Sequence, residues 1–274
     1  MVTGKGLFDK DFWQLMREQE VTSLAGVPYT YGMLARLQFF RMDLPALRIL
    51  TQAGGKLDPE LHRKFAQYAK VHDKRFVVMY GAAEATARMG WLPPELSLSK
   101  AGCMGWAIPG GRFELIDESG KEVDEAGVIG ELVYYGDNVA MGYAECGDDL
   151  AKGDEWQGRY ETGDMAERDA DGIYRIAGRK KRFLKIFGKR TNLEETEHIL
   201  RQHFGIVDIA CAGEDDLMRV YTTDERAGKE IKPYLAAKLG LHHSAFKVYV
   251  VPEIPKNAAG KTVYGDLCKL TTSG

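Results

Sequence analysis

The sequence has 274 residues, of which 45% are hydrophobic and 10% aromatic, as expected for a soluble globular protein. Its 40 acidic residues outnumber its 37 basic residues and give a formal net charge of -3, which argues against a broad basic surface for DNA or RNA. No apolar run approaches the ~20 residues of a membrane span, and the N-terminal segment lacks the apolar core of a signal peptide.

The cysteines and histidines indicate neither a disulfide framework nor a metal site. Cys103, Cys146, Cys211 and Cys268 are far apart and form no Cys-x-x-Cys pair, which is typical of free thiols in a reducing compartment. The histidines show no metal-ligand spacing tied to these cysteines. We therefore expect a cytoplasmic protein with no membrane span and no nucleic-acid partner.

Residues 1–100 alternate between helical and strand patterns. Helices are predicted over residues 9–20, 31–40 and 58–71, and strands over residues 22–26, 47–52 and 75–80. Asp58 is a good N-cap for the third helix, with Pro59 at its first position. Because the strands recur at intervals of about one βα unit, the pattern predicts a parallel sheet with helices packed on it.

The loops that leave these strands each contain glycine. They read GVPY (26–29), AGGK (53–56) and YGAAE (80–84). Open parallel sheets bind ligands at the carboxyl ends of their strands, and glycine there lets the backbone approach a flat ring or a phosphate closely. Any one loop also fits an ordinary turn, but the three together favour a ligand-binding edge.

The rest of the chain divides into two regions. Residues 101–178 predict a β-rich, antiparallel segment with strands over 112–117 and 128–136 and a hairpin over 163–178. Residues 179–274 predict a compact α+β domain. Its helices are expected over 193–204 and 229–240, and its strands over 206–213, 217–224 and 245–251. We therefore expect a domain boundary near residue 178, between 1–178 and 179–274.

The stretch GRKKRFLKIFGKR, residues 178–190, holds seven basic side chains in a chain of negative net charge. A solvated basic face, contacts to a small anionic ligand and nucleic-acid binding all fit such a run, the last least well. Phe183, Leu184, Ile186 and Phe187 interrupt it, which indicates a strand leaving a turn, with apolar residues anchored in a core.

Four stretches resemble the motifs of adenylate-forming enzymes, the superfamily of acyl- and aryl-CoA synthetases, carrier-protein ligases and luciferases. They are VMYGAAEATARMGWLPPE, RYETGD, GRKKRFLKIFGKRTNLEETE and IPKNAAGK. TQAGGKL and GELVYYGDNVAMGY also occur in the expected order and spacing. The resemblance covers essentially the whole chain. It implies part of the large AMP-binding lobe followed by the small mobile lobe.

The resemblance implies an acid–thiol ligase that uses ATP and Mg²⁺. A small carboxylic acid would attack the α-phosphorus of ATP, giving an acyl-adenylate and pyrophosphate. The acyl group would then pass to the thiol of CoA or of the phosphopantetheine on an acyl carrier protein. Such a chemistry needs a nucleotide site, a catalytic cation and a thiol channel.

The resemblance also implies roles for individual residues. Lys261 would be catalytic, since its ammonium suits developing phosphoryl charge. Asp164 would accept hydrogen bonds from the ribose hydroxyls, and Glu84 would bind Mg²⁺ beside the phosphates. The other expected nucleotide-binding residues are Gly54, Gly55, Lys56, Tyr80, Gly81 and Arg179. Each also fits strand-end packing, a turn or a surface position.

The resemblance also implies that the C-terminal domain rotates between the two steps, and further residues have roles in this rotation and in binding the acyl and thiol substrates. Lys181 aligns with the hinge between the two domain poses. Lys185, Gly188 and Arg190 would lie on the side of CoA or pantetheine, which explains the local positive charge. The acyl pocket would include Tyr29, Gly81 and Trp106.

The sequence departs from the family pattern in three places. It contains no Ser/Thr/Gly-rich phosphate loop ending in lysine, Ala83 stands where the family has threonine, and Tyr264 where it often has arginine. We therefore expect a fragment of a ligase that lacks the half with the phosphate loop. The alternative is a non-catalytic relative that binds a nucleotide or a partner.

Overall fold

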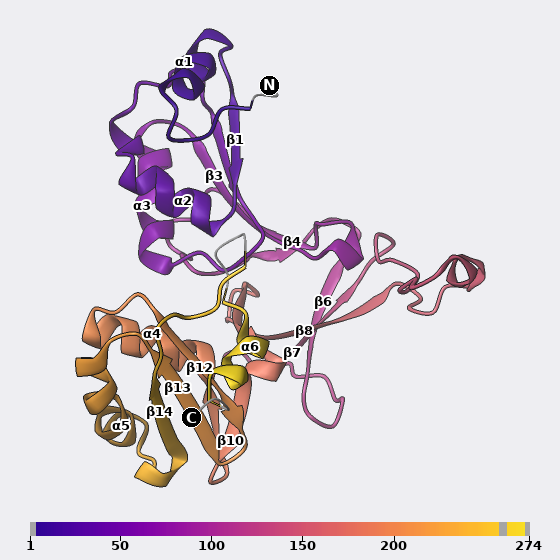
Figure 1. The fold of residues 1–274 in the computed structure, drawn as a ribbon. Coiled ribbons are helices and arrows are strands. Elements are labelled where there is room, and N and C mark those ends of the chain that lie inside the picture. The colour runs from indigo at the N-terminus through magenta and orange to yellow at the C-terminus, as the bar shows by residue number, and fades with distance from the viewer. Residues whose placement is uncertain (1–3, 258–261, 272–274) are drawn as a thin grey trace. The chain divides into compact units, whose positions relative to one another are not determined.

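The computed structural model describes residues 4–257 and 262–271, and the chain forms two compact units, Met1–Ala177 and Gly178–Gly274 (Figure 1). Each unit has its own sheets and its own hydrophobic clusters. Among the helices in the described part of the chain, none is both long and apolar enough to cross a membrane.

The first sheet of unit 1 has the strand order β1-β2-β3-β4-β5. These strands are β1 (Ser23–Gly26), β2 (Ile49–Gln52), β3 (Arg75–Tyr80), β4 (Gly90–Leu92) and β5 (Trp106–Ala107). The pairs β1–β2 and β2–β3 are parallel, whereas β4 and β5 join in antiparallel fashion. The parallel sheet predicted for this region is therefore confirmed for its first three strands.

Three helices accompany this sheet: α1 (Lys10–Glu18), α2 (Pro28–Arg36) and α3 (Pro59–Val71). The Asp58 carboxylate accepts hydrogen bonds from the backbone N–H groups of Glu60 and Leu61, both at 3.0 Å, so α3 begins where its cap predicts. The core between helices and sheet is aromatic. Tyr31 and Phe65 meet edge to face with ring centroids 4.8 Å apart.

Helix α2 differs from the predicted span of residues 31–40. It begins at Pro28, whose fixed φ suits the first helical turn, and it ends at Arg36. Gln38 then adopts a left-handed conformation with φ 57°, which interrupts the helix before a short 3₁₀ turn, Phe39–Arg41. The apolar periodicity continues through this break because Phe39 is fully buried.

The second sheet of unit 1 is antiparallel, as predicted, with the strand order β6-β7-β8-β9. Its strands are β6 (Arg112–Ile116), β7 (Gly130–Tyr135), β8 (Arg159–Arg168) and β9 (Tyr174–Arg179). At the β8–β9 turn, the Asp169 carboxylate accepts hydrogen bonds from the N–H groups of Asp171 and Ile173 at 3.0 and 2.9 Å. Gly172 follows with φ 78°, where glycine is favoured.

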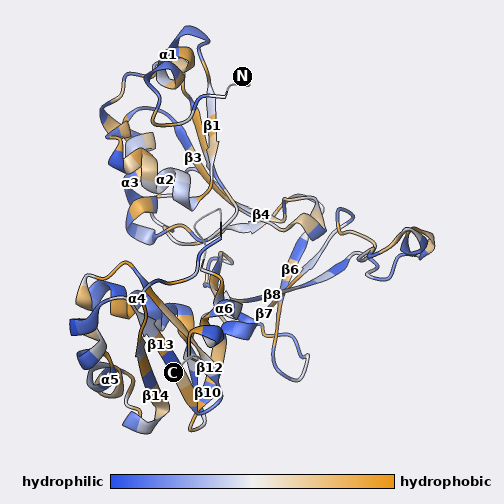
Figure 2. Cartoon of the chain, viewed as in Figure 1, coloured by the Kyte–Doolittle hydropathy of each residue, from blue (hydrophilic) through white to orange (hydrophobic). Residues whose placement is uncertain are grey.

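Unit 2 packs helices against a three-stranded sheet with the order β12-β13-β14. This sheet consists of β12 (Ile209–Glu214), β13 (Leu217–Thr222) and β14 (Phe246–Val250). The other two strands of unit 2, β10 (Phe183–Ile186) and β11 (Lys189–Asn192), pair with each other. Its helices are α4 (Leu193–Phe204), α5 (Glu225–Leu239) and α6 (Tyr264–Leu267). Figure 2 shows hydrophilic and hydrophobic stretches alternating along α4 and α5, whose apolar residues join the core.

Side-chain caps set the starts of the two long helices in unit 2. Asn192 accepts from the N–H groups of Glu194 and Glu195 at the start of α4. Asp224 caps α5, which therefore begins four residues earlier than the predicted span of 229–240. These elements, together with the mixed and antiparallel sheets of unit 1, confirm the predicted fold class.

Candidate functional site

The carboxyl ends of the first three strands meet at one edge of the sheet. In the parallel register, Gly26 pairs with Gln52, and Gln52 pairs with Val78. The three glycine-bearing loops therefore leave the sheet side by side, at the edge where open parallel sheets bind ligands. This edge is the frame of the candidate site.

The loop after β2 is held by its own polar contacts. The fully buried Gln52 donates hydrogen bonds from Nε2 to the carbonyls of Ala53 and Gly55 at 3.1 and 2.9 Å. Gly54 has φ 79°, a conformation that disfavours other residues. The Lys56 ammonium donates to the Ile176 carbonyl at 2.9 Å, so it ties this loop to β9. The predicted loop residues thus form a fixed surface.

Tyr80 and Asp164 lie 84 positions apart in sequence, and the structure brings them into contact. The Tyr80 hydroxyl donates to Asp164 Oδ2 at 2.5 Å. Asp164 is 5% exposed, and its N–H donates to Thr162 Oγ1, which in turn donates to the Leu132 carbonyl. The aspartate carboxylate is therefore fixed in position by β3 on one side and by its own strand, β8, on the other.

The turn after Tyr80 has an unusual backbone. A Cβ atom on Gly81 would lie 2.4 Å from the Ala87 carbonyl oxygen, so only glycine fits there. Thr86 and Ala87 both adopt left-handed conformations, with φ 50° and 63°. Such a conformation is costly for a β-branched residue and is typical of functional sites. The turn presents Glu84, which is partly buried.

The connection between β7 and β8 braces this turn. The Ala140 N–H donates to the Glu84 carbonyl at 2.7 Å, and the Tyr143 hydroxyl donates to Glu84 Oε1 at 2.7 Å. Asn138 Nδ2 donates to the carbonyls of Ala85 and Arg88. The hydrogen bond to Glu84 raises the pKa of Tyr143, so the phenol stays a donor. Sequence reasoning assigned no role to Asn138 or Tyr143, although both lie in the quoted GDNVAMGY stretch.

A magnesium ion fits Glu84 only in one mode. Within residues 4–257 and 262–271, no group of three His, Cys, Asp or Glu side chains could hold a metal. Mg²⁺ commonly binds one or two carboxylates and takes its other ligands from water and phosphate oxygens. A single partly buried carboxylate such as Glu84 fits that mode when a phosphate supplies the other oxygens.

Two of the residues expected around the acyl substrate are exposed to solvent. Tyr29 is 62% exposed in the first turn of α2, and Trp106 is 39% exposed in β5. Gly81 lies in the turn described above. Their part in an acyl pocket stays a prediction.

In unit 2, the predicted thiol-side residues lie on the β10–β11 hairpin. Lys185 pairs with Arg190 across the hairpin, and both are exposed. Gly188 has φ 79° in the turn, where an added Cβ would meet nothing within 4 Å. Phe187, expected in the core, is instead 56% exposed with φ 49°, because it occupies the tight turn beside Gly188.

The remaining predicted residues of unit 2 have separate positions. Arg179 ends β9, and Lys181 lies exposed in the 3₁₀ turn Lys180–Arg182. Lys261 lies outside the described residues. Its flanks are ordered by a β-bridge between Lys256 and Thr262.

One basic side chain of the 178–190 run is not on the surface. Arg182 is 9% exposed and forms an ion pair with the buried Glu197 at 2.5 Å. The interpretation of this run as a surface feature is therefore wrong for Arg182, because a buried carboxylate neutralises it. Nothing in the run itself signals which of its cations is buried.

The chain is similar in sequence to known AMP-binding enzymes and ligases. Residues 1–144 match the family model of AMP-binding enzymes. The medium-chain fatty-acid–CoA ligase of Escherichia coli (strain K12) is 29% identical over 251 residues, which cover 91% of this chain and 42% of that protein. The L-proline–[L-prolyl-carrier protein] ligase of Streptomyces coelicolor is 30% identical over 181 residues, covering 63% of this chain and 34% of that protein.

A solved structure shares the fold. The o-succinylbenzoate coenzyme A synthetase of Bacillus subtilis, in complex with AMP, superposes with a TM-score of 0.74 at 20% identity. The match covers 94% of this chain and 53% of that one. The same synthetase has been solved with ATP and a magnesium ion, and it superposes with a TM-score of 0.73. The chain thus spans about half the length, or less, of the relatives it matches.

Proposed function

Because the chain belongs to the AMP-binding enzyme family, we propose that it supplies the ribose-binding edge and the mobile domain of an ATP-dependent acid–thiol ligase. The observation that supports this most directly is the buried Asp164 carboxylate, held at 2.5 Å by Tyr80. A carboxylate fixed in this way can accept hydrogen bonds from both hydroxyls of a ribose.

The residues around Asp164 would bind the other parts of the nucleotide. The loop of Gly54, Gly55 and Lys56, with Tyr80 and Gly81, flanks the adenine, and Arg179 contacts the ribose or the phosphates. Glu84 would hold Mg²⁺, and the ion would supply charge neutralisation for the phosphates. Tyr143 keeps the Glu84 carboxylate oriented.

The proposed reaction has two steps. In the first, a carboxylate oxygen bonds to the α-phosphorus of ATP, the α–β phosphoanhydride bond breaks, and pyrophosphate leaves. Lys261 stabilises the charge that develops on the phosphoryl oxygens. In the second, a thiol loses its proton, its sulfur bonds to the acyl carbon, and AMP leaves with the electrons of the acyl–oxygen bond.

The thiol acceptor is CoA or the phosphopantetheine of a carrier protein. Both carry phosphate, which suits the exposed cations Lys185 and Arg190 that pair across the hairpin. Gly188 leaves open space beside its backbone for a narrow pantetheine arm. Lys181 lies in the short turn that precedes the hairpin, where we place the hinge of the domain rotation.

A non-catalytic, nucleotide-binding relative is the second candidate. The observation that favours it is Ala83, which sits in the turn beside Glu84 without a hydroxyl to contact phosphate or metal. Both candidates share the AMP site and differ only in the reaction.

The shared site can be tested by calorimetry on the 274-residue chain. We expect saturable heat of binding with AMP and much weaker binding of 2′,3′-dideoxy-AMP, which lacks both ribose hydroxyls. Equal binding of the two nucleotides, or no AMP binding, would contradict the proposal. Carboxylate-dependent ATP–pyrophosphate exchange, measured after a segment that carries the Ser/Thr/Gly-rich phosphate loop is added in trans, separates the ligase from the non-catalytic relative.

A further inference from the structure

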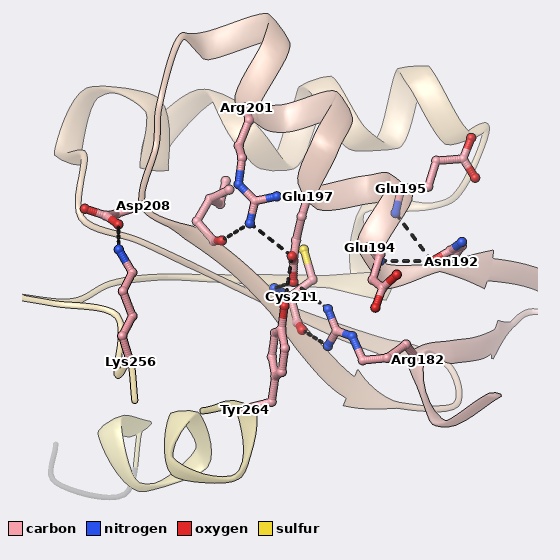
Figure 3. A network of polar contacts seen from close by, with 11 residues as sticks. Arg182, Asn192, Glu194, Glu195, Glu197, Arg201, Asp208, Cys211, Lys256 and Tyr264 are labelled. Atoms are coloured by element: carbon pink, nitrogen blue, oxygen red, sulfur yellow. Dashed lines mark hydrogen bonds and ion pairs between the residues drawn. The ribbon is translucent and has the colours of Figure 1, made fainter. Parts of the chain in front are cut away.

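A buried polar cluster in unit 2 is centred on Glu197 of α4 (Figure 3). Glu197 is 2% exposed. Its Oε1 accepts hydrogen bonds from Arg182 Nη2 at 2.5 Å and from the Cys211 N–H at 2.8 Å. Its Oε2 accepts from Arg201 Nη2 and from the Tyr264 hydroxyl, both at 3.1 Å. We call these five residues the Glu197 cluster.

The cluster joins segments that are far apart in sequence. Arg182 precedes β10, Cys211 belongs to β12, and Tyr264 begins α6. Arg182 Nη1 also donates to the Cys211 carbonyl at 2.6 Å, and Arg201 donates to the Ile209 carbonyl at 2.9 Å. The single carboxylate therefore holds two guanidinium groups, a strand and the C-terminal helix together.

Such a buried charge depends on all of its partners. A buried ion pair that loses one member leaves an uncompensated charge, which is strongly unfavourable. Burial, together with the negative charge of Glu197, raises the pKa of Tyr264 to about 12. The Tyr264 hydroxyl thus remains a donor to Glu197 at neutral pH.

Tyr264 contacts the cluster in two ways. Besides its hydroxyl bond to Glu197, its ring lies under the Arg182 guanidinium, with Arg182 Cζ 3.8 Å from the ring centroid. Leu267 of the same helix is fully buried beside Tyr221, Val251 and Ile254. Helix α6 (Tyr264–Leu267) is therefore fixed to α4 and to the sheet.

The residues that precede Lys261 are anchored separately. Lys256 forms an ion pair with Asp208 (Figure 3). It also forms a β-bridge with Thr262. The Val263 N–H donates to the Pro255 carbonyl at 2.9 Å. Both flanks of residues 257–261 are thus attached to the body of unit 2.

Arg182 and Tyr264 lie close in sequence to two residues with expected functional roles. Arg182 directly follows Lys181, the expected hinge, and Tyr264 comes three residues after Lys261, the expected catalytic lysine. We propose that Arg182, Glu197 and Tyr264 are positioning residues that tie the hinge segment to the segment carrying Lys261. This inference rests on the proposed function, which assigns the hinge and the lysine their roles.

The cluster restricts where the chain can rotate. Because Arg182 is held by Glu197 and Cys211, a rotation of the domains has to use backbone torsions before Arg182. Unit 2 then carries the flanks of Lys261 with it as one rigid body. If the Tyr264 contacts were lost, residues 262–267 could move independently of α4.

Hydrogen–deuterium exchange of the 274-residue chain, without nucleotide, tests this coupling. Two hydrogen-bonded amides report on it: Phe183, which donates to the Lys180 carbonyl, and Val263. We expect Tyr264→Ala to speed exchange at least fivefold in both segments, 180–183 and 262–267. Tyr264→Phe removes only the hydroxyl, so we expect about fivefold faster exchange at 262–267 and a smaller change at 180–183.

The reciprocal variant and a control complete the test. Arg182→Gln should speed exchange at 262–267, about 80 positions away. Leu235→Ala, in the core of unit 2 but outside the cluster, should speed exchange in all segments only as its global stability falls. If neither Tyr264 variant nor Arg182→Gln changes the distant segment beyond this global effect, the inference is overturned. Failure of AMP binding alongside the expected exchange pattern would contradict the proposed function and leave the physical coupling of the two segments intact, because the exchange measurement uses no nucleotide.

Discussion

The carboxylate of Asp164 is the most constrained polar group of the candidate site. It is buried, bonded to Tyr80, and set on β8 by the Thr162 hydroxyl. These contacts fix its position before any ligand arrives, which lowers the entropy cost of binding. A ribose would therefore meet a preformed acceptor.

We predict that Asp164→Ala removes most of the AMP affinity. Loss of a charged hydrogen-bonding partner typically costs about 1.5–3 kcal/mol, or roughly 10- to 150-fold in the dissociation constant. Calorimetry with AMP measures the loss. Tyr80→Phe is the matched control, since it keeps the ring and the carboxylate, and we expect a smaller loss from it. An unchanged affinity in Asp164→Ala would remove this residue from the site.

His62 links the stability of unit 1 to pH. It is buried in α3, where its Nε2 lies 2.9 Å from Ser97 Oγ and its Nδ1 accepts from the Gly102 N–H. Burial, and to a lesser degree the nearby Arg63, lowers the pKa of His62 to about 4. Below pH 6.5 the unfolded chain therefore takes up a proton that the folded chain does not.

We predict that the free energy of unfolding falls as the pH drops from 6.5 towards 4, by up to about 3 kcal/mol from this group. The stabilisation is fully present above pH 6.5. Urea denaturation at pH 7.5, 6.5 and 5.5 measures it, compared with His62→Asn, which cannot titrate. Identical pH slopes for the two proteins would show that His62 does not titrate differently on folding.

At the scale of elements, the connection between β7 and β8 supports the turn that carries Glu84. Asn138 Nδ2 bonds two carbonyls of this turn, and the Asn138 side chain is itself held by the Tyr134 hydroxyl at 2.8 Å. Trp156 packs edge-on against the Tyr143 ring, with centroids 4.9 Å apart. The connection thus acts on Glu84 through both backbone and side chain.

We predict that Asn138→Ala weakens the effect of Mg²⁺ on ATP binding and leaves AMP binding nearly unchanged. The two lost hydrogen bonds loosen the Glu84 turn, whereas Asp164 keeps its own contacts. Calorimetry of ATP with and without Mg²⁺ measures the difference. Tyr143→Phe should act in the same direction, since it frees only the carboxylate. A parallel loss of AMP affinity would mean that the connection supports the whole site instead.

Local signals predicted several elements to the residue. The cap and proline at Asp58 and Pro59 mark the start of α3, and the apolar pattern of residues 193–204 coincides with α4. The end of α2 was misplaced because the left-handed Gln38 leaves no mark in the periodicity. The starts of α2 at Pro28 and of α5 after Asp224 were missed although both carry a local signal.

For the candidate site, the sequence predicted which residues belong to it but not which of them are in contact. Motifs identified Tyr80 and Asp164, but their contact depends on packing between β3 and β8. The burial of Arg182 was not predictable, because charge runs usually lie on the surface and its partner Glu197 belongs to an amphipathic helix. Long-range pairings of this kind arise from tertiary structure alone.

At the scale of the molecule, we predict that residues 179–274 fold on their own. They have their own cores and two side-chain-capped helices, α4 and α5. The isolated piece should show a cooperative thermal transition by circular dichroism. Ile231→Ala, which empties a fully buried position, should lower its stability by about 2–5 kcal/mol. A gradual, non-cooperative melt would place the domain boundary elsewhere.

The last prediction concerns catalysis by the 274-residue chain. Phosphoryl transfer depends almost wholly on positioning and on stabilisation of charge. The sequence supplies Asp164, Glu84 and Lys261, but it contains no Ser/Thr/Gly-rich phosphate loop, and Ala83 offers no hydroxyl. The β- and γ-phosphates would therefore lack donors.

We accordingly expect AMP binding without carboxylate-dependent ATP–pyrophosphate exchange when the purified chain is tested with a panel of carboxylic acids. A full-length acyl-CoA ligase serves as the positive control, and Ala83→Thr should not by itself restore exchange, because one hydroxyl cannot replace a loop. Robust exchange by the chain alone would require a different phosphate site within these residues. In that event the basic side chains of the 178–190 run other than the buried Arg182 would be the first candidates, because this run is the densest positive charge in the sequence.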